Sequence, residues 1–380
     1  MGGSMNLDFT EEQEILRRTA RDFLAKEFPK TLVREMEEDA SGFRADIWKK
    51  MAELGWMGLI VPEDYDGIGG GFIDLIVLLE ETGRACLVAP FFSTTICTFP
   101  LLDAGSEDQK KIFLPRIAAG EEIFALALTE PTASYDAAGV TTKATGEKKG
   151  YLINGTKLFV HDAQAAHHLL CVARTNFQSP PEEGISLFFV DAGSQGLKVV
   201  SLPTIADDKQ NEVVFDNVLV PEGNMIGELN GGWPVVRRLL ERASVAKCAE
   251  MIGGADWVVE NCIAYAKERV QFGKPIGSFG IIQHYLAQMW TELGHARWLV
   301  YYAGWLLDRG LPCAREAATA KARMSEVYRH CTRMGVQILG GIGTTREHDM
   351  GLYYRRARQA LPLFGSPDSC REKLAHEIGL

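Results

Sequence analysis

The chain has 380 residues, of which 46% are hydrophobic and 24% are charged, a balance typical of a globular protein. Its formal net charge of −10 disfavours nucleic acid or an anionic membrane as the main partner, because both would repel it. No apolar run reaches the roughly 20 residues that span a bilayer. The eight cysteines are scattered without a Cys-x-x-Cys pair, so we expect reduced core residues rather than disulfides or a zinc knuckle.

The first five residues, Met1 to Met5, lack the apolar or arginine-rich pattern of a targeting peptide and look like an added leader, so cytoplasm is the expected compartment. Helices are expected next. Thr10 and Gln13 have the spacing of a capping box. Further helices are expected over 46–54 and 72–85, with a loop rich in glycine, proline and aspartate between them.

Between residues 123 and 226 the period changes, and short β-rich runs alternate with turn-forming segments. Asn154-Gly155, inside the run 151–160, is typical of a hairpin turn. Further strands are expected over 168–173, 185–190, 197–202 and 212–220. These runs predict a small antiparallel sheet domain.

Helical patterns return after the β region and continue to about Arg358. The order predicts an α+β multidomain protein with an N-terminal helical domain (5–122), a middle antiparallel β domain (123–230) and a C-terminal helical bundle (231–380). A cofactor site is expected at the junction of such domains.

Three motifs carry candidate chemistry. Leu128-Thr129-Glu130-Pro131, followed by Ser134, is a turn whose amides and hydroxyls suit a flavin edge and a pyrophosphate, although a plain strand-entry turn is the alternative. In Arg269-Val270-Gln271-Phe272-Gly273, the arginine can hold a phosphate and the aromatic ring can cover a flat ring; a basic helix end is the alternative. Gln337 precedes Gly340-Gly341, which permits close backbone approach or merely caps a helix.

In this order and separation the motifs resemble the acyl-CoA dehydrogenase family over residues 7–375. The resemblance implies the family's three-domain fold with a C-terminal four-helix bundle and with FAD at the domain junction. It implies α,β-dehydrogenation of an acyl-CoA thioester, electron transfer to an electron-transferring flavoprotein, and a homotetramer or heterotetramer. The FAD contacts that it implies are Leu128, Thr129, Ser134, Phe159, His161, Arg269, Gln271, Phe272, Gln337, Gly340 and Gly341.

The chain departs from the family at the catalytic base. Most members carry a glutamate about ten residues after Tyr-Arg-Asp-Ala, whereas here Tyr354-Arg355-Arg356-Ala357 leads to Phe364. A phenyl ring cannot accept a proton. The backbone N–H of Phe364 can still polarise the thioester oxygen, as it does in the family.

Some relatives, such as isovaleryl-CoA dehydrogenase, carry the base within a Leu-Glu-Arg on the first helix of the C-terminal domain. This implies Glu241 as the base and Arg242 as a substrate contact. The spacing from Arg242 to Arg269 differs by about two residues from those relatives. The alternative is a solvated Glu241 that pairs with Arg237 or Arg238.

A second departure lies at Phe159 and His161, where the family usually has a tryptophan and a hydroxyl residue. Phe159 can still shield the flavin. His161 would replace a hydroxyl that hydrogen-bonds flavin N5, unless it simply faces outward. His167 and His168 predict no metal site, since neighbours on a strand face opposite ways and no carboxylate completes a ligand set.

Three functions are consistent with the sequence. The first is a dehydrogenase that uses Glu241. The second is a family member that performs desulfination, decarboxylation or oxidase chemistry without this base. The third is a partner subunit of a heterotetrameric dehydrogenase, against which the intact FAD motifs weigh. The acyl specificity depends on pocket packing that the sequence does not give.

Overall fold

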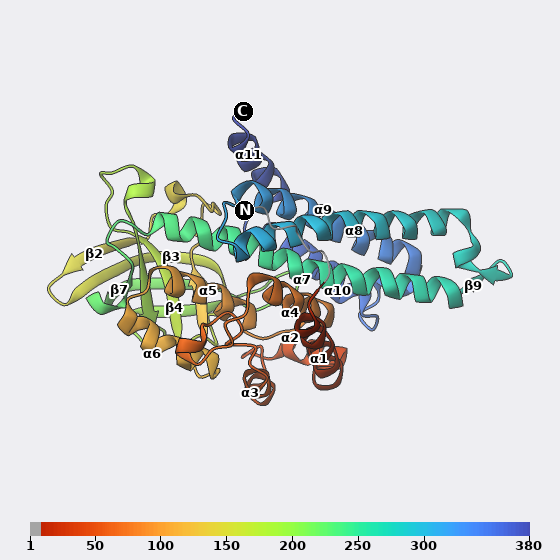
Figure 1. Cartoon of the computed structure of the whole chain (residues 1–380), viewed down its shortest axis with the longest axis horizontal. Coiled ribbons are helices and arrows are strands. Elements are labelled where there is room, and N and C mark those ends of the chain that lie inside the picture. Colours follow the sequence, from red (N-terminus) through yellow and green to blue (C-terminus); the bar gives the residue numbers. More distant parts are fainter. Residues whose placement is uncertain (1–8) are drawn as a thin grey trace. The chain divides into compact units, whose positions relative to one another are not determined.

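The computed structural model describes residues 9–380, so the expected leader at Met1 to Met5 lies outside the described residues. The chain forms two compact units that do not follow its linear order. The first, here named the helical unit, combines residues 9–33 with residues 71–87 and 244–380. The second, the sheet unit, comprises residues 34–70 and 88–243. Figure 1 labels their elements.

In the helical unit, α9 packs against α8, α10 and α11, and α4 packs against α1 and α8. A short antiparallel hairpin, β9–β10, connects α7 to α8 (Figure 1). The elements are α1 (Glu11–Glu27), α4 (Phe72–Ala85), most of α7 (Trp233–Glu268), β9 (Val270–Gln271), β10 (Lys274–Pro275), α8 (Gly280–Asp308), α9 (Ala314–Leu339), η6 (Gly340–Thr344), α10 (Met350–Ala360) and α11 (Pro367–Glu377).

The predicted start of the first helix is confirmed. The Thr10 hydroxyl accepts a hydrogen bond from the Gln13 backbone N–H at 3.3 Å, and the Gln13 side chain accepts one from the Thr10 N–H at 3.0 Å. This reciprocal pair satisfies two amides that a helix N-terminus leaves open. The helix expected over 72–85 is present with those bounds.

Helices α4 and α7 cross at a pair of glycines. A Cβ atom on Gly253 of α7 would lie 1.7 Å from the Glu80 carbonyl oxygen, and one on Gly83 of α4 would lie 2.0 Å from the Glu250 carbonyl oxygen. No real Cβ tolerates such a distance, so both positions need glycine for the backbones to approach. The crossing thereby fixes α7 against the N-terminal helices of the same unit.

The sheet unit contains one eight-stranded sheet with the strand order β6-β7-β3-β2-β4-β5-β8, and β1 pairs with β4. Its elements are α3 (Ala45–Glu53), η1 (Glu63–Tyr65), α5 (Phe91–Ala104), α6 (Glu107–Ala118), β1 (Phe124–Ala127), η2 (Ala137–Gly139), β2 (Lys143–Glu147), β3 (Gly150–His161), β4 (His168–Arg174), η3 (Pro181–Glu183), β5 (Ile185–Asp191), β6 (Leu197–Leu202), β7 (Gln210–Val220), η4 (Glu222–Asn224) and β8 (Met225–Ile226), with α2 (Lys30–Glu38) shared between the units. The helix expected over 46–54 corresponds to α3, and the strands expected after residue 168 correspond to β4 to β7.

The expected antiparallel sheet is wrong in one respect, because the sheet is mixed. Strand β4 pairs in parallel with β1 and, at one position, with β2, whereas the other pairs are antiparallel. The parallel pairs arise because the chain makes a long crossover before it returns as β4. Short β-rich runs in a sequence do not reveal this connection.

The hairpin expected at Asn154-Gly155 is also wrong, because β3 runs unbroken through both residues. The Asn154 side chain bonds to Asn217 on β7, and the β3–β7 register shifts between Ile153 and Gly155. A Cβ on Gly155 would lie 2.5 Å from the Thr142 hydroxyl. The Asn-Gly pair therefore forms a bulge with close backbone approach, not a turn.

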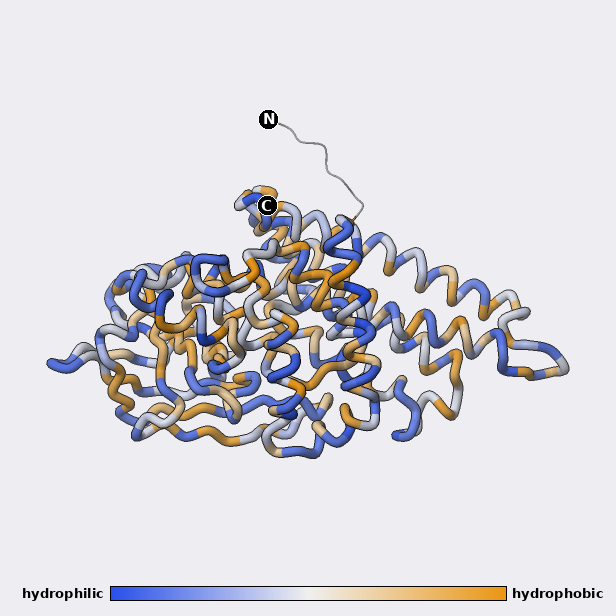
Figure 2. Tube along the Cα trace, turned by 60° about the horizontal axis from the view of Figure 1, so that its bottom comes forward, coloured by the Kyte–Doolittle hydropathy of each residue, from blue (hydrophilic) through white to orange (hydrophobic). Residues whose placement is uncertain are grey.

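Hydrophobic and hydrophilic residues alternate along the whole described chain (Figure 2). All residues of β5 except the last are buried, as are all of β4 except the first. The eight cysteines are buried, which confirms the prediction that they are core residues. Among residues 9–380, no helix has the length and hydropathy that crossing a membrane requires.

The glycine crossing makes a stability prediction. Gly253→Ala should lower the free energy of unfolding by about 3 kcal/mol, near the upper end of overpacking costs, because backbone atoms of α4 cannot move aside. Gly280→Ala is the control, since a Cβ there meets nothing within 4 Å. Its effect should stay within about 0.5 kcal/mol. Urea unfolding measures both, and equal values for the two variants would contradict the close crossing.

Candidate functional site

The expected site residues fall into two groups, one in each unit. Leu128, Thr129, Ser134, Phe159, His161, Glu241 and Arg242 belong to the sheet unit, and Arg269, Gln271, Phe272, Gln337, Gly340, Gly341 and Phe364 belong to the helical unit. Each group is described within its own unit.

In the sheet unit, the turn after β1 lies against β3. The Leu158 backbone N–H donates to the Thr129 carbonyl oxygen at 2.8 Å, and the Lys157 ammonium donates to the Leu128 carbonyl oxygen at 3.0 Å. The first motif and the segment that precedes His161 are thus brought together, although they are far apart in the sequence.

A buried ion pair anchors this turn. The Lys157 Nζ lies 2.8 Å from Glu130 Oε1, and both side chains are almost completely buried. Glu130 also accepts hydrogen bonds from the backbone N–H groups of Thr141 and Thr142, each at 2.9 Å. Burial alone would raise the pKa of Glu130, but the Lys157 charge and these hydrogen bonds leave it below its usual value.

Sequence reasoning gave neither Glu130 nor Lys157 a role. The available signal was a lysine inside a strand that is otherwise apolar at its inward-facing positions, where a buried ammonium requires a partner. Lys157 also donates to the Val172 carbonyl oxygen at 2.6 Å, which ties β3 to β4. The Lys157–Glu130 pair therefore stabilises the turn. Neither of its side chains is among the expected cofactor contacts.

Phe159 stands at an irregularity of β3. Its backbone lies in the left-handed region with φ 55°, and the β3–β7 register shifts between Lys157 and Val160. Bulges of this kind redirect a side chain. The Phe159 ring is 47% exposed although its neighbours Lys157 and Val160 are buried. An exposed ring in a constrained position suits the cover of a flat ligand.

His161 is partly buried, and its Nδ1 lies 3.5 Å from Asp208 Oδ2. The Asp208 carboxylate accepts hydrogen bonds from the Thr204 hydroxyl at 2.5 Å and from the Gln210 side chain at 2.6 Å. Nδ1 of His161 therefore faces the Asp208 carboxylate, whose position is fixed by hydrogen bonds from Thr204 and Gln210.

Ser134 lies in a separate turn, where its hydroxyl donates to Asp136 at 3.1 Å and accepts from the Asp136 N–H at 3.0 Å.

Glu241 and Arg242 lie in the first turns of α7, both half-buried. The strand β5 anchors the start of this helix, because the Gly232 N–H donates to the Ile185 carbonyl oxygen at 2.8 Å. Arg242 donates to Asp103 at 2.7 Å, and Arg238 lies 3.6 Å from the same carboxylate.

In the helical unit, Arg269, Gln271 and Phe272 lie on the exposed β9–β10 hairpin. The Phe272 ring is 93% exposed and contacts Phe279 only edge to face. The hairpin and the glycine motif lie at the same end of the unit, since the Tyr265 hydroxyl donates to the Leu339 carbonyl oxygen at 3.5 Å. The second and third motifs are therefore brought together.

The glycine motif is open to approach. Gly340 has φ 65° and ends α9, so it also serves as the helix cap that was the alternative interpretation of this motif. A Cβ on Gly340 or Gly341 would meet nothing within 4 Å in the chain. The free space in front of these glycines fits a ligand that lies against the backbone.

Phe364 is buried in the turn between α10 and α11, and its φ is 57°. The left-handed region costs a residue with a Cβ roughly 1–2 kcal/mol. Strain of this kind persists only where the surroundings hold the backbone in place, and it is common at functional sites.

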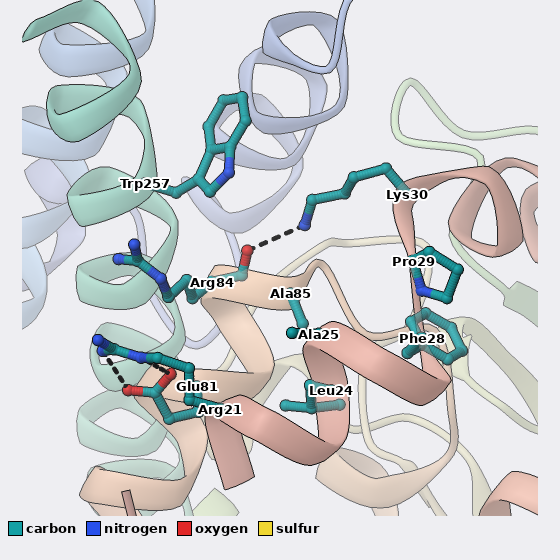
Figure 3. Close-up of a pocket in the computed structure, with 10 residues that line it drawn as sticks. All are labelled: Arg21, Leu24, Ala25, Phe28, Pro29, Lys30, Glu81, Arg84, Ala85 and Trp257. Atoms are coloured by element: carbon teal, nitrogen blue, oxygen red, sulfur yellow. Dashed lines mark hydrogen bonds and ion pairs between the residues drawn. The ribbon is translucent and has the colours of Figure 1, made fainter. Parts of the chain in front are cut away.

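Two concave sites lie apart from these groups. The pocket of about 460 Å³ in Figure 3 lies between α1, α4 and α7 and contains none of the expected site residues. Its cations are already engaged. Arg21 binds Glu81 at 2.7 and 2.9 Å, and Lys30 donates to the Arg84 carbonyl oxygen at 3.0 Å.

The second concave site contains His167 and His168. A carboxylate does approach both histidines, because Glu122 Oε2 lies 3.4 Å from His167 Nδ1 and from His168 Nε2. His167 precedes β4, so the alternation of side chains along a strand does not apply to it. Within residues 9–380, no group of three or more His, Cys, Asp or Glu side chains is arranged to hold a metal ion.

Known proteins resemble the chain over nearly its whole length. The acyl-CoA dehydrogenase N-terminal, middle and C-terminal domain families match residues 10–121, 125–218 and 230–379. An acryloyl-CoA reductase (NADH) from Anaerotignum propionicum is 32% identical over 98% of this chain and 96% of its own length. The caffeyl-CoA reductase-Etf complex subunit CarC from Acetobacterium woodii is 34% identical over 92% of this chain and 93% of its own.

A solved structure gives the same result. Butyryl-CoA dehydrogenase from Megasphaera elsdenii superposes with a TM-score of 0.91 at 29% identity and covers 98% of this chain and 100% of its own. The chain therefore belongs to the acyl-CoA dehydrogenase family, which confirms the resemblance and the three-part fold. It is an oxidoreductase of that family.

The buried ion pair makes a prediction. Lys157→Met should destabilise the protein by about 3–5 kcal/mol, because it leaves the Glu130 carboxylate buried and unpaired. Since pairing lowers the pKa of Glu130, its contribution to stability is present at neutral pH and is lost as pH falls through the folded-state pKa.

The measurement is urea unfolding at neutral and acidic pH. The stability difference between the wild type and Lys157→Met should shrink as Glu130 becomes protonated. Lys143→Met, on the exposed side of the neighbouring strand, is the control. A difference that is independent of pH would contradict the ion pair.

Proposed function

We propose that this chain is an FAD-dependent acyl-CoA dehydrogenase that removes two hydrogens from the α and β carbons of an acyl-CoA thioester. The observation that carries the proposal is the turn at Leu128 and Thr129, which is hydrogen-bonded to Lys157 and Leu158, the two residues that precede the exposed Phe159. This arrangement offers backbone polar groups at the edge of a flat ligand and an aromatic ring on its face.

Each group, within its own unit, fits part of an FAD molecule. In the sheet unit, Leu128, Thr129 and Ser134 would hold the flavin edge and the pyrophosphate, with Phe159 and His161 against the ring. In the helical unit, the exposed hairpin would contribute Arg269, Gln271 and Phe272, and the open glycines would let the dinucleotide lie against Gln337, Gly340 and Gly341. An exposed aromatic ring contributes little to the stability of the free protein, and an unobstructed glycine backbone lets a ligand approach closely. Both features are therefore expected at a binding site.

FAD, when bound, supplies the acceptor for the β-hydride. The chain's own residues have three tasks. The Phe364 backbone N–H donates to the thioester carbonyl oxygen and so stabilises the charge that develops when the α-proton leaves. A carboxylate of Glu241 accepts that proton. Arg242, which Asp103 orients, contacts the substrate.

The position of Glu241 along α7 bears on this assignment. The helix is unbroken from Trp233 to Glu268, and each residue turns a helix by about 100°. An offset of two residues from the relatives with a Leu-Glu-Arg base therefore turns Glu241 to another side of the helix. The second candidate is a family member that works without this base, and one experiment separates the two.

Glu241→Gln should bind FAD and acyl-CoA normally but reduce its flavin about 10²–10⁴-fold more slowly, the usual contribution of a general base. Glu260→Gln on the same helix is the control, because its exposed carboxylate pairs with Arg84. Stopped-flow flavin bleaching with an acyl-CoA panel under anaerobic conditions gives the rates. A wild-type rate in Glu241→Gln would assign the reaction to the base-free alternative.

Partners follow from the relatives. The CarC relative is named as a subunit of a complex with Etf, which supports an electron-transferring flavoprotein as the electron acceptor here. The reductase and dehydrogenase names among the relatives describe opposite directions of the same two-electron exchange, so the enoyl-CoA is a second ligand of this site.

We further propose a homotetramer or heterotetramer, with the exposed hairpin available to a neighbouring copy. A cytoplasmic location stays a prediction.

The hairpin provides a test of cofactor binding. Phe272→Ala should leave the thermal stability of the FAD-free protein unchanged, because the ring packs against almost nothing in the chain. It should weaken FAD retention by about tenfold, which corresponds to the stacking energy of one aromatic ring. Val270→Ala on the same hairpin is the control. Equal FAD retention in both variants would remove Phe272 from the cofactor site.

A further inference from the structure

The turn that carries Phe364 is held by a buried ammonium group. The Nζ of Lys321, on α9, lies 3.0 Å from the Leu361 carbonyl oxygen and 2.9 Å from the Gly365 carbonyl oxygen. It also lies 3.3 Å from the Ala360 carbonyl oxygen and 2.9 Å from the Ser325 hydroxyl. The side chain of Lys321 is fully buried.

These contacts are more than a helix cap. Ala360 and Leu361 end α10, and a lysine that bonds to the last carbonyls of a helix is a common arrangement. Gly365 lies outside that helix, on the other side of Phe364. Lys321 therefore bonds to backbone carbonyls on both sides of Phe364, at Leu361 and Gly365, and holds the turn that contains the strained residue.

All four oxygen atoms that the ammonium contacts are uncharged. Burying a positive charge against neutral acceptors costs more stability than an apolar side chain of similar length would. Burial also lowers the pKa of Lys321 to about 8. An arrangement that is costly for stability and centred on a strained backbone indicates that the exact position of that backbone matters.

We propose that Lys321 is a positioning residue that directs the Phe364 backbone N–H toward the substrate thioester oxygen. The inference rests on the proposed role of that N–H. The lysine does not touch the substrate. It sets the direction of the hydrogen bond through the carbonyl groups of Leu361 and Gly365, so that its loss affects catalysis through the turn.

The test uses the FAD-loaded protein with bound crotonyl-CoA that carries ¹³C at the thioester carbon. Isotope-edited infrared difference spectra report the carbonyl stretch, which falls when a donor polarises the oxygen. In Lys321→Met most of this fall should disappear. The kcat should decrease by about 100-fold, the cost of one misplaced oxyanion donor, with little change in KM. Lys321→Arg should restore part of both.

Ser325→Ala is the matched control, because it removes one acceptor and leaves the three carbonyl contacts. Its carbonyl stretch should equal that of the wild type. If Lys321→Met does not fold, the carbonyl stretch is measured in the wild type between pH 7 and pH 9.5 instead. Polarisation of the thioester carbonyl should weaken over this range as the Lys321 ammonium loses its proton.

Two outcomes contradict different claims. A wild type without any fall in the carbonyl stretch would refute the proposed role of the Phe364 N–H. A wild type with the fall, together with a Lys321→Met variant that keeps it or a polarisation independent of pH, would overturn only the role of Lys321.

Discussion

A buried ammonium group that binds backbone carbonyls is the interaction on which the candidate site residues of each unit depend. In the sheet unit, Lys157 bonds to the Leu128 carbonyl oxygen and to Glu130, and so holds the turn beside Phe159. In the helical unit, Lys321 bonds to the carbonyl oxygens on both sides of Phe364. Each lysine lies behind a segment whose backbone, rather than its side chains, is expected to meet the ligand. A backbone donor can be placed accurately only if something rigid holds it, and a buried charge with several acceptors meets that requirement.

The two lysines differ in how their charge is compensated. Lys157 faces a carboxylate, so removal of either partner leaves the other charge buried, and the pair contributes to stability around neutral pH. Lys321 donates to four neutral oxygens, and burial lowers its pKa although the nearby Cys248 and Cys370 thiols oppose that shift. The first arrangement is therefore expected to govern folding, and the second to govern the geometry of a turn.

The sequence predicted the elements with strong local signals and missed those that tertiary contacts decide. The capping box at Thr10 and the helix over 72–85 depend on neighbouring residues, and both are present. Asn154-Gly155 has the composition of a turn, but pairing with Asn217 on another strand overrides it. The parallel pairing of β1 with β4 depends on a crossover that no local pattern encodes. The site motifs were visible as sequence, whereas Lys157 and Lys321 were not, because each acts on carbonyl groups whose positions only the fold supplies.

The same reasoning applies to the missing base. Phe364 stays the residue that the sequence predicts at the position of the family's usual base, and the proposed substitute, Glu241, lies on α7, which is unbroken from Trp233 to Glu268. The chain keeps the strained turn at Phe364 and the lysine, Lys321, that holds it. The proposed donor in this turn is a backbone N–H, which needs no particular side chain at position 364.

The most direct test of the central claim is an anaerobic titration of the purified protein with straight-chain, branched and aromatic acyl-CoA thioesters, with analysis of the products by mass spectrometry. We expect the protein to carry FAD, at least one thioester to bleach the flavin absorption band, and the product to be two hydrogens lighter than the substrate. A protein that holds no flavin, or one that releases a product of different composition, would contradict the account.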